Sequence, residues 1–226
     1  MNLFAGNSLW QLVVQADTVS KCVLLLLLCL SVLCWAVFIG KLALLYAKER
    51  QLKNINNKVQ KAKTLSDLAE ISTAASKTAP GYFIAKNLSF VKELTQHTFA
   101  QKLGIHEWEL LERNIDNTIE TLVLHNEEYI PILSSCAAVG PLVGLFGTVW
   151  GLVHSFMRIS ETQVADIATI APGMAEALIT TLAGLIVAIP ALVMFNYLHV
   201  KTRALEHNLI VLADRVTFIL QQLRER

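Results

Sequence analysis

The sequence predicts an all-α integral membrane protein with three transmembrane helices and long cytoplasmic helical extensions. Of its 226 residues, 54% are hydrophobic and only 16% are charged, which is typical of a small membrane protein and not of a soluble domain. Three apolar runs are also long enough to cross a bilayer, because about 20 helical residues span its ~30 Å hydrocarbon core.

The basic residues predict how the chain is oriented. Residues 1–20 are expected to form a periplasmic or interfacial segment, and residues 21–46 a first span with a bulky, lipid-facing centre. A dense basic cluster follows directly: Lys48, Arg50, Lys53, Lys58, Lys61 and Lys63. The positive-inside rule places this cluster in the cytoplasm and the N-terminus in the periplasm. A patch that binds phosphate or nucleic acid is the alternative interpretation.

Residues 47–130 are predicted to form a cytoplasmic helical region. Thr64 or Ser66 can cap a helix, and Pro80-Gly81 is expected to end it. A second helix is expected over 82–99, followed by a break at Gly104. From about His106 one long helix is expected to run without interruption into the next span.

The second span is predicted over 131–157. One face of it carries glycines within about 60° of one another, and bulky apolar side chains lie opposite; the glycines are Gly140, Gly144, Gly147 and Gly151. Small residues at this spacing let helix backbones approach closely, so packing explains the glycines. Packing explains less easily why Thr148 borders them.

The third span, predicted over 167–198, contains a single carboxylate, that of Glu176. A charge at the centre of a spanning helix costs roughly 2.5–3.5 kcal/mol, so such residues generally have a partner or a function. Small and hydroxyl side chains share its side of the helix, while leucine, isoleucine and valine lie opposite; the small side includes Gly173, Thr180, Thr181 and Gly184. This face is either a packing face that happens to hold a carboxylate or an ion path, with protons as the expected ion.

Depth connects the two spans. The link at 158–166 has no basic excess and is expected outside. Thr148 and Glu176 would then lie at similar depth, each about 13 Å below the outer end of its helix, with Thr181 about 7 Å deeper. Hydroxyls and a carboxylate staggered in this way can relay protons. Pro141 and Pro190 are internal to their spans and are expected to kink them.

Residues 199–226 predict a cytoplasmic C-terminal helix with a coiled-coil-like seam. Enzymatic function is not indicated. The six histidines and four cysteines lack metal-ligand spacing, and the chain contains no phosphate loop or nucleophile–base motif. We therefore expect no cofactor and no metal, with the proton as the coupling ion.

Two runs resemble the TolQ/ExbB family of proton channels, which is more distantly related to MotA: GPLVGLFGTVWGLVHSF at 140–156 and APGMAEALITTLAGLIVAIPALVMFNYL at 171–198. The short N-terminus looks more like TolQ than ExbB. The resemblance implies that Glu176, Thr148 and Thr181 match the pore-lining carboxylate and threonines of the family. Thr180 departs from the small apolar residue expected there and adds a hydroxyl near Glu176.

The resemblance also implies a working assembly. In that family five copies form a ring around a pore that holds two single-span helices of a TolR- or ExbD-like partner. The expected function is a proton-channel and stator subunit of the inner membrane of a Gram-negative bacterium. It would energise TolA in the Tol-Pal system, for outer-membrane integrity and cell division. The alternatives are an ExbB-like subunit that energises TonB-dependent uptake, and a structural membrane scaffold.

Overall fold

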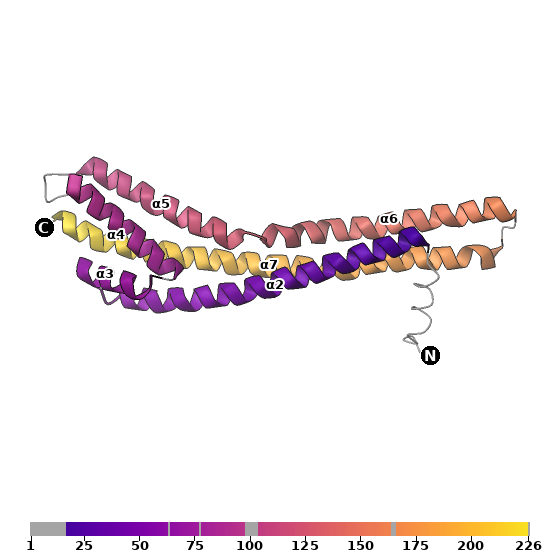
Figure 1. The fold of residues 1–226 in the computed structure, drawn as a ribbon, viewed down its shortest axis with the longest axis horizontal. Helices are drawn as coiled ribbons and strands as arrows, with labels where there is room; N and C mark the ends of the chain where they lie inside the picture. The colour runs from indigo at the N-terminus through magenta and orange to yellow at the C-terminus, as the bar shows by residue number, and fades with distance from the viewer. Residues whose placement is uncertain (1–16, 63, 77, 98–103, 164–165, 226) are drawn as a thin grey trace. The chain divides into compact units, whose positions relative to one another are not determined.

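The computed structural model describes residues 17–62, 64–76, 78–97, 104–163 and 166–225, and these are entirely without strands (Figure 1). The predicted interfacial segment at 1–20 lies outside them except for its last four residues. The helices in chain order are α2 (Thr18–Val59), α3 (Leu65–Ala74), α4 (Ala79–His97), α5 (Ile105–Glu127), α6 (Ile130–Thr162) and α7 (Ile167–Glu225). The predicted all-α class is confirmed. Three of the helices, α2, α6 and α7, are long and apolar enough to cross a membrane.

The chain divides into two compact units. The membrane unit comprises Met1–Ile39 and Tyr129–Tyr197, and the extension unit comprises Gly40–Glu128 and Leu198–Arg226. Both α2 and α7 therefore contribute residues to each unit.

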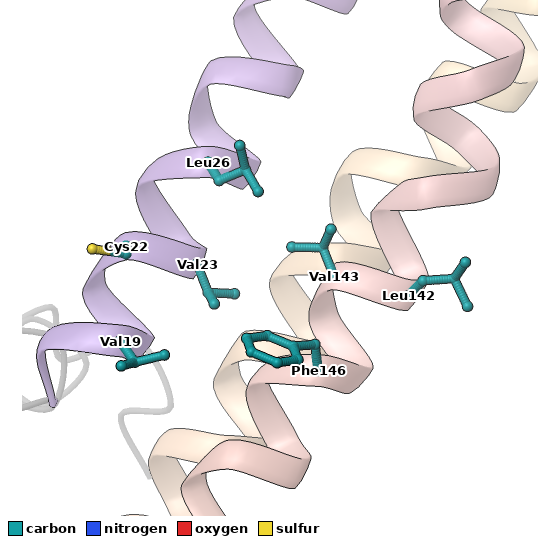
Figure 2. A pocket seen from close by; sticks show the side chains of 7 residues that line it. All are labelled: Val19, Cys22, Val23, Leu26, Leu142, Val143 and Phe146. Atoms are coloured by element: carbon teal, nitrogen blue, oxygen red, sulfur yellow. The ribbon is translucent and has the colours of Figure 1, made fainter.

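Within the membrane unit, α6 and α7 pack through small residues while their bulky side chains point outward. Leu142, Leu145 and Phe146 of α6 are more than half exposed, as are Leu178 and Leu182 of α7. Between α2 and α6 an apolar hollow of about 360 Å³ remains. Figure 2 shows Val19 and Val23 of α2 across this hollow from Phe146 of α6.

The extension unit has a conventional core of buried leucine, isoleucine, valine and phenylalanine. The stripe predicted on the last part of α7 is buried at Leu205, Leu209, Leu212 and Val216. Asn87 of α4 is fully buried within this unit. It donates to the Phe83 carbonyl at 2.8 Å and accepts from Asn114 of α5 at 2.9 Å. Its polar groups are thereby paired, as burial requires.

Basic side chains of α2 and α7 also hold the extension unit together. Buried Asn126 accepts from Lys48 at its side-chain oxygen, at 2.6 Å, and from Lys41 at its carbonyl, at 3.3 Å. Lys201 of α7 pairs with Glu49 of α2 at 3.2 Å. Part of the basic cluster that indicated the cytoplasm thus stabilises the chain itself.

Two of the predicted helix boundaries are correct. Thr64 caps α3 by a capping box with Asp67, and α5 begins directly after Gly104. The predicted break at Pro80-Gly81 is wrong, because both residues lie in the first turn of α4, where a proline needs no hydrogen-bond donor.

The predicted continuous helix from His106 into the second span is also wrong. Helix α5 ends at Glu127, Tyr129 adopts a left-handed conformation with φ 68°, and α6 restarts at Ile130. Pro131 supplies the reason, since its ring would clash with the Glu127 carbonyl in an unbroken helix.

Candidate functional site

The candidate site lies in the membrane unit, where the first residues of α2 meet α6 and α7. Glu176 is half-buried at the edge of α7. Its Oε1 accepts a hydrogen bond from the backbone N–H of Asp17 at 2.8 Å. This contact joins residues 159 positions apart in the sequence.

Asp17 is itself held by further donors, among them a side chain of α6. Its Oδ2 accepts from the indole Nε1 of Trp150 on α6 at 3.0 Å, and from the backbone N–H of Val19 at 3.4 Å. The second of these bonds caps the start of α2. The Trp150 bond lowers the pKa of Asp17 below its ordinary value, against a smaller, opposing effect of burial. One end of α2 is thus tied to both other spanning helices.

The contact between α6 and α7 is built on glycine. A side chain at Gly144 would come within 3.0 Å of the Thr180 carbonyl, and one at Gly151 within 2.9 Å of the Ala177 side chain. Gly147 faces Thr180, Gly173 faces Ser155, and Gly140 and Gly184 face each other. All six glycines assigned to packing therefore lie between two helices of the same chain.

Each threonine hydroxyl of the predicted pathway has a backbone acceptor. Thr181 donates across the helix contact to the Gly144 carbonyl at 3.0 Å. Thr180 is fully buried against Gly147 and donates to Ala177 of its own helix at 2.7 Å. Thr148 is half-buried and donates to Leu145 of its own helix at 2.7 Å. A hydroxyl that donates in this way still has lone pairs with which to accept a proton donor.

The register of the two helices changes the predicted depths. Gly147 lies beside Thr180 and Gly151 beside Ala177, so Thr148 lies near the level of Thr180 and Glu176 near that of Gly151. Thr148 and Glu176 therefore differ by about one helical turn, or ~5 Å, in place of the similar depth expected from the sequence.

The residues also occupy different sides of α7. At about 100° per residue, Thr181 lies about 140° around the helix from Glu176. Glu176 contacts Asp17, directly before α2, whereas Thr181 contacts α6. The structure thus brings Thr180 and Thr181 onto the glycines of α6 and brings Glu176 to Asp17. The roles of all four residues in a proton route stay predictions.

Two polar residues of this site were missed from the sequence, Asp17 and Trp150. The available signal was that Asp17 is the only charged residue before Lys21. Pro141 and Pro190 lie inside α6 and α7, which continue through them, and their kinks stay predictions. Over the described ranges, no three side chains of His, Cys, Asp or Glu gather to hold a metal ion.

The arrangement leaves part of the Glu176 carboxylate available to a further hydrogen-bond donor. A half-buried carboxylate with one fixed donor keeps acceptor capacity on its second oxygen. Glu176 lies outside the tight contact between α6 and α7, so its side chain stays partly exposed.

Comparison with known proteins matches residues 86–210 to the MotA/TolQ/ExbB proton channel family. The biopolymer transport protein ExbB of Salmonella typhimurium is 34% identical over 195 residues, which cover 84% of this chain and 76% of that protein. The Tol-Pal system protein TolQ of Haemophilus influenzae is 29% identical over 93% of this chain and 92% of its own length. TolQ of Pseudomonas aeruginosa is 29% identical over 98% of this chain and 96% of its own length. The chain belongs to the MotA/TolQ/ExbB proton channel family.

Proposed function

We propose that this chain is the proton-channel and stator subunit of a Tol-Pal-type motor in the inner membrane. It would couple the proton motive force, together with a TolR-like partner, to a TolA-like protein that maintains the outer membrane and serves cell division. The observation that carries the proposal is Glu176, the carboxylate of the third apolar helix, held at the edge of a glycine-packed helix pair. An intramembrane carboxylate generally marks an ion or proton pathway.

A single chain supplies only part of such a pathway. The bulky side chains of α6 and α7 that are exposed in the single chain require lipid or further protein around them. We propose that five copies form a ring and that a TolR- or ExbD-like dimer occupies its centre, with the N-terminus periplasmic and the C-terminus cytoplasmic. The partner would supply the second proton-carrying acid.

An ExbB-like role is the second candidate, because ExbB of Salmonella typhimurium is 34% identical to this chain. The chain would then energise a TonB-like protein for uptake across the outer membrane. Co-purification separates the two roles, since a Tol-type subunit retains a TolR-like protein and a Ton-type subunit an ExbD-like one. A pure scaffold held together by its glycine faces has less support, because these glycines already pack within one chain.

The test of the proton-channel function is Glu176→Gln, which removes the charge and keeps the size of the side chain. Proton flux in liposomes that contain the chain and its partner should be abolished, and resistance of cells to detergent should fall, while assembly persists. Glu161→Gln is the matched control, because Glu161 is exposed near the end of α6. Full flux through the Glu176→Gln protein would contradict the proposal.

A further inference from the structure

The hydrogen bonds at the start of α2 form one connected chain through three helices. The indole of Trp150 donates to the Asp17 carboxylate, and the Asp17 backbone N–H donates to the Glu176 carboxylate. Lys21 on α2 and His154 on α6 are the titratable neighbours on the adjoining turns, and His154 interacts electrostatically with Asp17. Trp150 thus holds Asp17, and Asp17 in turn holds the carboxylate of Glu176.

These hydrogen bonds restrict the orientation of the Glu176 side chain. A glutamate has three rotatable side-chain bonds, so a half-buried carboxylate samples several positions unless a donor holds it. The donor here is a backbone N–H at a helix N-terminus, where the aligned peptide dipoles also favour a negative charge. Because the donor belongs to the main chain, its position depends on how the end of α2 is anchored.

We propose that Asp17 and Trp150 are positioning residues that anchor the end of α2 and thereby hold the carboxylate of Glu176 in place for proton exchange. The inference rests on the proposed function of Glu176 and extends it to the first span. The first span then takes part in setting the geometry of the pathway, in addition to facing lipid.

The sharpest variant is Asp17→Pro, because proline removes the backbone N–H that holds Glu176 and also the carboxylate that Trp150 anchors. Proline is tolerated at the start of a helix, so α2 should still form. Thr18→Pro is the matched control, since it places the same residue one position later and keeps both the Asp17 N–H and the Asp17 carboxylate. It removes only the Thr18 N–H, which also bonds that carboxylate. We expect proton flux to fall about tenfold or more in Asp17→Pro and to stay within about twofold of native in Thr18→Pro.

Conservative variants separate positioning from simple stability. Asp17→Asn keeps both the N–H and a side-chain acceptor for Trp150, and it should restore most of the flux. Trp150→Phe keeps a ring but removes the indole donor, and its flux should fall between those of Asp17→Asn and Asp17→Pro. All variants should assemble with the partner to the native extent.

A spectroscopic measurement tests the contact without reference to activity. In protein labelled with nitrogen-15 aspartate, the amide proton resonance of Asp17 should move upfield in Glu176→Ala and stay in place in Thr148→Val. An unmoved resonance in Glu176→Ala, or equal flux in Asp17→Pro and Thr18→Pro, would overturn the inference. The proposed function fails separately, by full flux in Glu176→Gln.

Discussion

Glu176 lies at the edge of the contact between α6 and α7, and its neighbours explain why a carboxylate is tolerated there. One oxygen is bonded to the Asp17 N–H, and the side chain is half-buried in the single chain. A buried carboxyl group without a hydrogen-bond partner would be destabilising, and the Asp17 N–H supplies one partner here. The other side of Glu176 is therefore where a proton donor from elsewhere can approach.

Replacing Thr181 shows how much its hydroxyl contributes to the stability of the helix contact. Thr181→Val keeps the volume but removes the donor to the Gly144 carbonyl, which should destabilise the protein by about 1 kcal/mol. Thr148→Val should leave stability nearly unchanged, because the Thr148 hydroxyl bonds only within its own helix. Thermal unfolding in detergent measures both effects.

The same two variants separate a pathway from a scaffold. If the hydroxyls relay protons, both valine variants reduce flux, although only Thr181→Val reduces stability. If flux in Thr148→Val equals that of the native protein, a role of its hydroxyl in the pathway is excluded.

At the scale of the helices, the close approach of α6 and α7 depends on the absence of side chains on α6. Gly144→Leu would place its Cβ within 3.0 Å of the Thr181 Cα and the Thr180 carbonyl, so the helices must separate. We expect loss of stable, correctly assembled protein, measured by size-exclusion chromatography and melting temperature. Gly40→Leu is the control, since a Cβ added there would meet no atom within 4 Å beyond its own helix turn and chain neighbours, and it should behave like the native protein. A folded, fully assembled Gly144→Leu protein would contradict this packing.

Helices α2 and α5 are joined in the extension unit through Asn126. Asn126→Leu removes the side-chain oxygen that accepts from the Lys48 ammonium, and the half-buried ammonium loses this hydrogen bond. The free energy of unfolding should then fall by about 1–3 kcal/mol, as measured by denaturant titration in detergent. Asn117→Leu, at an exposed position of the same helix, should change the stability by less than about 0.5 kcal/mol. Equal effects of the two variants would show that the Asn126 contact contributes nothing.

Helix ends were predictable from the sequence where a local cap sets them. Thr64 with Asp67 three residues later, and Gly104 before Ile105, are read from neighbouring residues alone. The break at Tyr129 does not follow from periodicity, because the apolar pattern of α5 continues into the next span, whereas the ring of Pro131 interrupts the helix. Pro80 is ambiguous in the sequence, because a proline within the first turn begins a helix as readily as it follows one.

The candidate site was only half predictable for a related reason. Glu176 and the glycine stripes follow from composition and helical period, which are local properties. The register of α6 against α7 does not follow from the sequence. Helix α6 continues to Thr162, so the depth of Thr148 counted from Met157 was too small. The contact of Asp17 with Glu176 depends on the packing of α2 against α7, which one sequence does not reveal.

At the scale of the whole molecule, the basic residues predict how the chain is oriented in the membrane. Those that follow the first span, with Lys201, Arg203 and Arg215 after the third, should keep both extensions in the cytoplasm. Green fluorescent protein fused after Arg226 should therefore fluoresce. Alkaline phosphatase inserted at Gln163, between α6 and α7, should be active, because that enzyme needs the periplasm to form its disulfides.

The control for this topology is alkaline phosphatase inserted at Lys61, after α2, which should be inactive. Reversed activities at Gln163 and Lys61 would place Glu176 in the cytoplasmic half of the membrane, and protons would then reach this site late on their way inward. With the predicted orientation, the end of α2 and the Glu176 carboxylate lie on the periplasmic side, where the proton motive force supplies protons. The topology therefore decides whether this site can act as the entrance of the pathway.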